Sequence, residues 1–301
     1  MVWLIKKRYF IYLISFICIG VIGSSCSENR IELTDTLVDS VNQGEGEIVD
    51  FEIKDTLSDT KSITVFGPGR YVTIYAFLHG ASTDTPPIQT KYYKSNSAGR
   101  LIPIGSPMKL ITGHYDFYAV SANTLANRTP SFTNGFSSAL SNNTDYLWSK
   151  MNNRWIAPGN NKVPFAFRHT CAEIIIEVKE TFFTFIHFID VVQIAVPTGK
   201  GIMALSSGEI DIAPSLQKKL QPMKVKDNIC EILLLPYSDE LSLTVIFKLW
   251  VNLEWDYKLF STRIPLPDNT LKPGRSYEYE AIIKDNIFDL KIKEPVSSNS
   301  Q

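Results

Sequence analysis

A run in which every second residue is apolar constrains the fold of this chain most strongly. It runs through LSLTVIFKLWVNLEW, residues 241–255, in which every odd position is apolar. Side chains alternate between the two faces of a β-strand, whereas an α-helix repeats every 3.6 residues, so the run excludes a helix. It predicts strands with one buried face and a hairpin turn near Asn252. Trp255 lies on the buried side of this pattern and Trp250 on the other.

Shorter strand-like segments, separated by turn signals, occupy most of the remaining chain. Residues 163–179 are interpreted as one long strand with a bulge near His169, where the alternation changes phase. Residues 185–197 fit either a strand buried on both faces or a short helix leading into a strand. The predicted fold class is therefore all-β. The other predicted strands cover residues 47–54, 70–78, 88–93, 101–104, 113–122, 257–267 and 286–295, and a further strand follows a turn at Pro273 and Gly274 within residues 271–284.

The amino terminus has the pattern of a secretory signal. Three basic residues precede an uncharged apolar run of 15 residues, 9–23, which is shorter than the ~20 residues of a membrane-spanning helix. Small residues and then Cys26 follow, the arrangement in which a bacterial signal peptidase cuts before a cysteine that becomes acylated. We predict a signal peptide at residues 1–25 and a lipidated, polar tether at residues 26–45. The alternative is an ordinary secreted protein in which Cys26 is a free thiol.

The length of 301 residues suits two domains of ordinary size. A polar section over residues 122–162 offers the best boundary. We therefore predict an N-terminal β-sandwich over residues 46–160, a C-terminal β-sandwich over residues 161–295 and a polar tail at residues 296–301.

Two cysteines, Cys171 and Cys230, remain once Cys18 is assigned to the signal and Cys26 to the lipid. Two cysteines make no disulfide framework, and no C-x-x-C motif suggests a metal. Buried free thiols are the preferred interpretation, and a disulfide between the two is the alternative.

Catalytic and cofactor motifs are missing from the sequence. The four histidines show no metal-binding spacing, and no phosphate-loop, dinucleotide or nucleophile-elbow pattern occurs. The net charge of −1 and the pI of about 6.4 provide no basic face for nucleic acid. We expect no enzymatic activity, no cofactor, no metal and no nucleic-acid partner.

The segment GHYDFYAVSA, residues 113–122, raises a question about its aromatic residues. They could form an exposed platform for a sugar ring, or they could belong to a strand of the core. Alternation places Tyr115, Phe117 and Ala119 on one face, with Asp116 and Tyr118 on the other.

Several segments together resemble the fimbrillin-like lipoproteins of Gram-negative anaerobes, a family of fimbrial subunits and anchors. They are the cysteine after the signal, FGPGRYVTIYAF, GHYDFYAVSA, DYLW, VPFAFRHTCAEIIIEV and LKPGRSYEYEAIIK. The resemblance implies two tandem transthyretin-like β-sandwich domains. It also implies an outer-membrane, surface-exposed protein that adheres to host or bacterial ligands and assembles with other subunits by exchanging strands. Within that fold, GHYDFYAVSA becomes a core strand.

The resemblance further implies candidate modification sites. In shaft subunits an arginine-specific protease removes the first strand, and Arg70, after the GPG turn, is the candidate position here. Related anaerobes glycosylate Asp-Ser/Thr-aliphatic triplets, which occur here around Thr36, Ser40 and Thr56.

The tail after Pro295 is too short and polar to donate a strand, which favours a lipid-bearing anchor or accessory component over a shaft subunit. The alternative function is a surface lipoprotein that binds a glycan or another nutrient.

Overall fold

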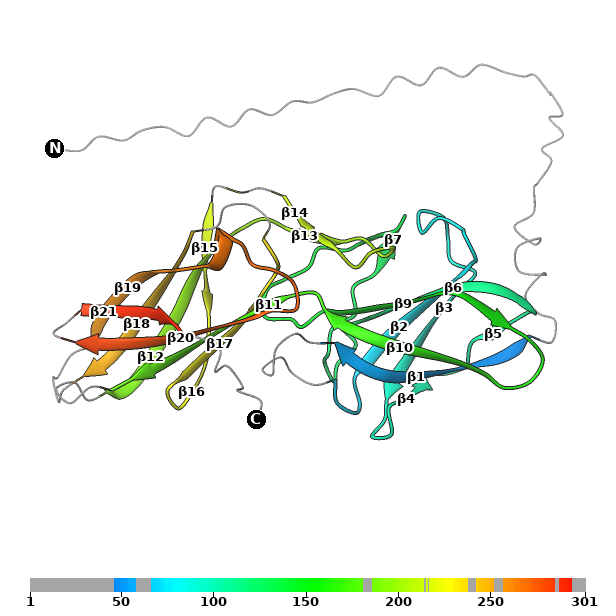
Figure 1. The fold of residues 1–301 in the computed structure, drawn as a ribbon, viewed down its shortest axis with the longest axis horizontal. Coiled ribbons are helices and arrows are strands. Elements are labelled where there is room, and N and C mark those ends of the chain that lie inside the picture. Colours follow the sequence, from blue (N-terminus) through cyan, green and yellow to red (C-terminus); the bar gives the residue numbers. More distant parts are fainter. Residues whose placement is uncertain are drawn as a thin grey trace, which may run out of the picture. The chain divides into compact units, whose positions relative to one another are not determined.

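The computed structural model describes residues 46–57, 66–180, 186–213, 215, 217–237, 242–251, 257–284 and 287–293 (Figure 1). Within these ranges the chain forms strands β1 to β21 and one short 3-10 turn, η1 (Pro267–Asn269). The prediction of an all-β protein is confirmed. No helix among these residues is long and apolar enough to span a membrane.

The first large sheet contains eight strands in the order β10-β9-β6-β2-β3-β4-β1-β5. Because β1 pairs with β10 as well as with β4, seven of these strands close into a ring, with β5 attached to β1. In the structure this half is one sheet that curls around its own core. The strands are β1 (Glu47–Leu57), β2 (Tyr71–Leu78), β3 (Gln89–Ser95), β4 (Arg100–Pro103), β5 (Lys109–Leu110), β6 (Gly113–Ser121), β9 (Leu147–Ile156) and β10 (Asn161–His169).

The residues inside the ring explain why it closes. Alternate positions of the strands point inward and are aromatic or branched, and they make one continuous buried cluster. Closure removes the unpaired strand edges that an open sheet would leave. The larger members of the cluster are Phe51, Ile74, Tyr93, Met108, Leu110, Tyr115, Phe117, Leu147, Phe165 and Phe167.

The chain leaves this sheet at Thr170 and Cys171. β10 ends at His169 and pairs with β1 and β9, whereas β11 (Ala172–Lys179) belongs to another sheet. The phase change near His169 therefore marks a crossing between two sheets and not a bulge within one strand. Residues 161–169, which were expected in the second domain, belong to the first sheet. The polar section 122–162 contains β9, one of its central strands.

The second half of the chain has two sheets around a common core, in the orders β16-β17-β11-β20-β21 and β15-β12-β18-β19. β12 is a strand throughout its length, with register shifts near His187 and Asp190, so the helical alternative is wrong. The bounds are β12 (Ile186–Pro197), β15 (Lys218–Pro222), β16 (Lys224–Lys226), β17 (Ile229–Leu234), β18 (Leu243–Val251), β19 (Lys258–Ile264), β20 (Ser276–Lys284) and β21 (Ile287–Ile292).

The long alternating run of residues 241–255 contains β18. The odd positions of this strand are buried in the second core, and its even positions are half-buried. Residues 252–256, including Trp255 and the expected turn, lie outside the described residues.

Two short hairpins join the halves. They pair β7 (Phe132–Thr133) with β8 (Phe136–Ser137), and β13 (Gly201–Met203) with β14 (Ile210–Ile212). A bridge between Phe136 and Ala204 places the hairpins side by side. One face of this pair packs on the outer surface of β2, β6 and β9, forming a third buried cluster that includes Tyr75, Phe77, Tyr118, Trp148, Met203, Leu205 and Leu235.

Candidate functional site

The first strand, β1, closes the ring by pairing in parallel with β10. The register runs from Val49 opposite Asn161 to Leu57 opposite Arg168, with one irregularity between Ile53 and Asp55. On its other side β1 pairs antiparallel with β4 and β5. A strand from the start of the described chain is therefore hydrogen-bonded along both of its edges.

The side chain of Phe51 anchors β1 in the interior of the ring. Its aromatic ring lies 5.2 Å from that of Tyr93, 5.5 Å from that of Phe117 and 5.7 Å from that of Phe165, measured between centroids. Without β1, these three rings would line an open apolar groove between the edges of β4 and β10.

The candidate processing residue, Arg70, is half-buried in a turn held at several points. Its backbone N–H donates to Ser95 Oγ at 2.9 Å, and its carbonyl accepts from the Ser95 N–H at 3.0 Å. The Gly69 N–H donates to the Ser95 carbonyl at 2.7 Å. A protease must bind its substrate in an extended, accessible form, and these bonds oppose that form.

The other predicted modification sites fall largely outside the described residues. Cys26, Thr36 and Ser40 precede residue 46. Thr56 belongs to β1, where its backbone lies opposite Phe167, and its side chain is among those not described.

The aromatic strand β6 is buried on both faces. Tyr115, Phe117 and Ala119 belong to the core of the ring, while Tyr118 and Val120 belong to the cluster beneath the hairpins. The core interpretation of GHYDFYAVSA is therefore confirmed, and this strand provides no aromatic platform.

A small polar and aromatic patch, formed by His79, His114, Asp116 and Trp155, lies at the end of β6. The His114 and Trp155 rings are 4.6 Å apart, and 49% of the surface of Trp155 is exposed. Asp116 accepts from His79 Nδ1 at 2.9 Å, the Gly80 N–H at 3.0 Å and the Asn153 N–H at 2.7 Å. Burial raises the pKa of Asp116, but the hydrogen bonds from Asn153, Gly80 and His79 outweigh burial and hold this pKa below its usual value.

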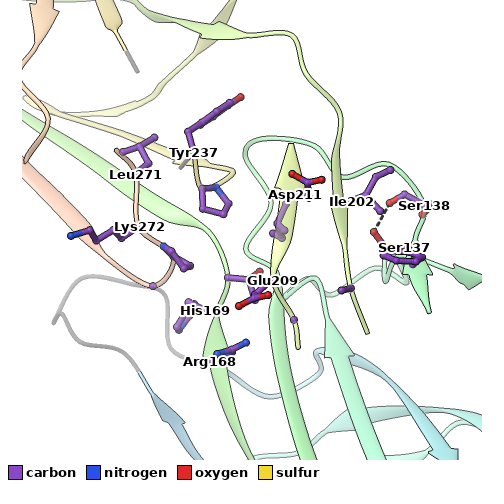
Figure 2. A pocket seen from close by; sticks show the side chains of 18 of the residues that line it. Ser137, Ser138, Arg168, His169, Ile202, Glu209, Asp211, Tyr237, Leu271 and Lys272 are labelled. Carbon is purple, nitrogen blue, oxygen red and sulfur yellow. Dashed lines mark hydrogen bonds between the residues drawn. The ribbon is translucent and has the colours of Figure 1, made fainter. Parts of the chain in front are cut away.

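A cavity of about 1480 Å³ opens beside the two hairpins (Figure 2). One wall is the outer face of the hairpins, with Phe136, Ile202, Glu209 and Asp211. Residues 270–274, which precede β20, and the end of β10 contribute the other walls.

A buried histidine fixed by a carboxylate lines the inner wall of this cavity. His169 Nδ1 lies 2.8 Å from Asp145 Oδ1, and the His169 side chain is only 1% exposed. The other oxygen of Asp145 accepts from Asn123 Nδ2 at 2.8 Å. The carboxylate identifies Nδ1 as the donor of the ring, so that in the neutral form Nε2 is an acceptor.

Charged side chains of both signs line the cavity. Arg168 places its guanidinium 4.5 Å from the Trp148 ring centroid and donates to the Ser207 carbonyl. Glu209 accepts from Ser207 Oγ at 3.2 Å, and Asp211 is exposed. In the sequence, His169 stands out only as a phase change. Asp145, Glu209 and Asp211 carry no sequence signal, because they lie in segments without regular alternation.

Both remaining cysteines are free and buried. Cys171 belongs to the cluster beneath the hairpins and Cys230 to the second core, so the preferred prediction of separate thiols is confirmed. Burial raises the pKa of each thiol to about 12. Within the described ranges, no group of three or more His, Cys, Asp or Glu side chains could hold a metal ion.

A family model described as fimbrillin-like matches residues 60–298, most of the chain. The chain belongs to the fimbrillin-like family. This finding confirms the resemblance inferred from the sequence, and it places all strands from β2 to β21 inside the matched region. No curated protein is significantly similar to the chain.

Three solved structures from Bacteroides, each described as a candidate cell adhesion protein, share the fold. The one from Bacteroides uniformis has a TM-score of 0.63 at 14% identity and covers 84% of this chain and 97% of its own. The Bacteroides ovatus structure has a TM-score of 0.56 at 15% identity, covering 83% and 96%. The Bacteroides fragilis structure has a TM-score of 0.53 at 14% identity, covering 85% and 99%. At these identities the likeness concerns the fold alone.

Proposed function

We propose that this protein is a fimbrial subunit or an anchor or accessory lipoprotein for surface adhesion, and that it assembles through β-strand complementation. Family membership and the adhesion proteins that share its fold support the adhesive role. The finer proposal that both halves derive from transthyretin-like sandwiches rests on the sequence resemblance.

The observation that carries the assembly proposal is the position of β1. It is paired along both edges, in parallel with β10 and antiparallel with β4, and it fills an aromatic groove through Phe51. A strand of a neighbouring subunit with alternating apolar residues could replace these backbone hydrogen bonds and this side-chain packing.

Among family roles, we favour the anchor or accessory component, with acyl chains on Cys26 holding the protein in the outer membrane. Two observations support this choice. The backbone of Arg70 is hydrogen-bonded to Ser95, which opposes removal of β1. The last strand, β21, is paired with β20 from Tyr279–Ile292 to Lys284–Ile287 and would have to leave its sheet to act as a donor.

Two engineered disulfides test strand complementation. Glu52 lies opposite Arg100 across β1 and β4, and Glu280 lies opposite Lys291 across β20 and β21. Directly opposed Cβ atoms in antiparallel strands are about 4.5–5.5 Å apart, close to disulfide geometry. The pair Glu52→Cys with Arg100→Cys locks the first strand, and Glu280→Cys with Lys291→Cys locks the last.

Each variant is expressed with and without reductant, the fibres are sheared from the cells, and the amount of the variant in them is measured. We expect the oxidised β1 lock to block incorporation, reductant to restore it, and the oxidised β21 lock to have no effect. Equal incorporation of both oxidised variants would show that neither strand is displaced. Cys26→Ser tests the anchor separately, because this variant should leave the membrane fraction. A fibre-bound chain that starts at Tyr71 would instead assign a shaft role.

A further inference from the structure

We propose that the cavity beside His169 binds an uncharged oligosaccharide, and that this is the ligand recognised in the adhesive role proposed above, on which the inference rests. The cavity volume of about 1480 Å³ exceeds the roughly 300–1,000 Å³ of common small-molecule pockets. It therefore suits a ligand of several rings better than a single small molecule.

The polar groups in the cavity select a ligand that donates many hydrogen bonds. Glu209 and Asp211 are two residues apart along one edge of the β13–β14 hairpin, and both line the cavity (Figure 2). His169, fixed by Asp145, lies behind them in the wall, with its side chain almost fully buried. Sugar hydroxyls are donors spaced for such acceptors, and a carboxylate can accept two of them at once.

The charges of the lining residues favour a neutral ligand. Arg168 and Lys272 line the same cavity as Glu209 and Asp211, so the four formal charges cancel. Both cations have protein partners already: Lys272 Nζ lies 2.9 Å from Asp268 Oδ2, and Arg168 donates to the Ser207 carbonyl. An anionic ligand would meet the two carboxylates and would have to compete with these partners for the two cations.

An exposed apolar surface adjoins these acceptors. Phe136 is 56% exposed and Ile202 is 41% exposed, and both belong to the cavity-facing side of the hairpins. One face of a sugar ring presents C–H groups, which pack well on an aromatic ring, while its hydroxyls project from the edge. The apolar surface of Phe136 and Ile202 and the polar acceptors beside it thus match the apolar face and the polar edge of a sugar ring.

The hairpins that carry these groups are held rigidly from behind. Met203 and Leu205 are buried in the cluster on the opposite face, and the Met203 N–H donates to Ser137 Oγ at 2.9 Å. Trp148 Nε1 donates to the Leu205 carbonyl at 2.8 Å. A preformed wall loses little conformational entropy when a ligand binds, which favours affinity.

The test uses the purified full-length mature protein on an array of neutral, sialylated and sulfated oligosaccharides. The tightest neutral oligosaccharide is then titrated by calorimetry into the wild type and the variants. Phe136→Ala removes part of this apolar surface, and Asp211→Asn removes one charged acceptor. Tyr92→Ala and Asp227→Asn are the matched controls, since both residues are exposed elsewhere on the chain.

We expect binding to a neutral oligosaccharide, weakened about tenfold or more by each cavity variant, because Asp211→Asn weakens a hydrogen bond to a charged group and Phe136→Ala removes the aromatic surface on which the sugar packs. The controls should stay within about twofold, and thermal unfolding should be unchanged in all four variants. The cavity proposal is overturned if no neutral glycan binds, if both cavity variants bind like the wild type, or if only sialylated glycans bind. Loss of binding in Trp155→Ala but not in Phe136→Ala would move the site to the patch around His114.

Peptides rich in lysine form a further arm of the experiment. Binding of such a peptide without any neutral glycan, lost in Asp211→Asn, would overturn the saccharide in favour of a basic protein partner. The strand-lock assay is run on the same variants. If the protein is incorporated into fibres but binds no glycan, only the cavity proposal is wrong. If it binds a glycan but is not incorporated, only the assembly proposal is wrong.

Discussion

Gly208 lies in close contact with the indole ring of Trp148, at the point where the β13–β14 hairpin meets the first sheet. Its φ is +69°, and a Cβ atom added to it would lie within 2.9 Å of three atoms of that ring. The same indole donates to the Leu205 carbonyl and carries the Arg168 guanidinium on its face. The glycine therefore permits the close approach that ties the hairpin to Trp148.

Gly208→Ala is expected to destabilise the protein by more than the ~1–2 kcal/mol cost of a left-handed alanine. Gly105→Ala is the matched control, since Gly105 has a φ of +88° and a Cβ added to it would meet no atom within 4 Å. The difference in unfolding free energy between the two variants, measured by denaturant titration, isolates the contact with Trp148. Equal losses in both would mean that the hairpin does not depend on this contact.

The pKa of Asp116 makes stability depend on pH in a defined direction. Because this pKa is lowered in the folded protein, the carboxylate stabilises the fold fully above the ordinary value of 3.8, and this contribution is lost as the pH falls through the lowered pKa. Asp116→Asn should lower the free energy of unfolding by about 1.5–3 kcal/mol near pH 7, because the hydrogen bonds that Asp116 accepts lose their charged acceptor.

Urea titrations of the wild type and Asp116→Asn at a series of pH values should show two stability curves that converge below pH 3.8. Asp227→Asn, at an exposed turn residue, is the control and should follow the wild type closely. A gap that stays constant down to the lowest pH would contradict the assignment of the stabilisation to the charged carboxylate.

The thiols of Cys171 and Cys230 should be inert in the folded protein. A pKa of about 12 for each leaves only ~1 thiol in 10,000 ionised at pH 8, and the thiolate is the reactive species. Iodoacetamide labelling followed by peptide mass spectrometry should find both cysteines unmodified in native protein and modified in urea. Rapid labelling of either one without denaturant would show that its cluster opens readily.

The sequence predicts well those parts of the fold in which one strand has one buried face, and β18 follows directly from its alternation. The aromatic β6 is buried on both faces, so its alternation alone leaves two interpretations open, and the family resemblance decides for the core. The closed first sheet could not be predicted this way, because alternation shows which side of β1 is buried and not which strand lies beside it. Its parallel partner β10 starts more than a hundred residues later, at Asn161.

The cavity shows the same limit at the level of side chains. His169, Asp145 and Glu209 are distant in the sequence and come together only because the chain crosses between sheets at Thr170 and the β13–β14 hairpin folds back over the first sheet. Spacing rules detect ligands carried on one element, and these three residues lie on separate elements.

The parallel pairing of β1 with β10 also sets the order in which the parts of the molecule can fold. Pairing of segments so far apart in the sequence loses the conformational entropy of the intervening chain before any contact compensates for it, so we expect this pairing to form late. Until residues 161–169 have emerged and docked, β1 has only its short pairings with β4 and β5, and the aromatic groove stays accessible. Pulse-labelled hydrogen exchange during refolding should accordingly find the amides of β1 among the last to be protected. The newly made protein would then pass through an interval in which its future binding groove is open without any proteolysis.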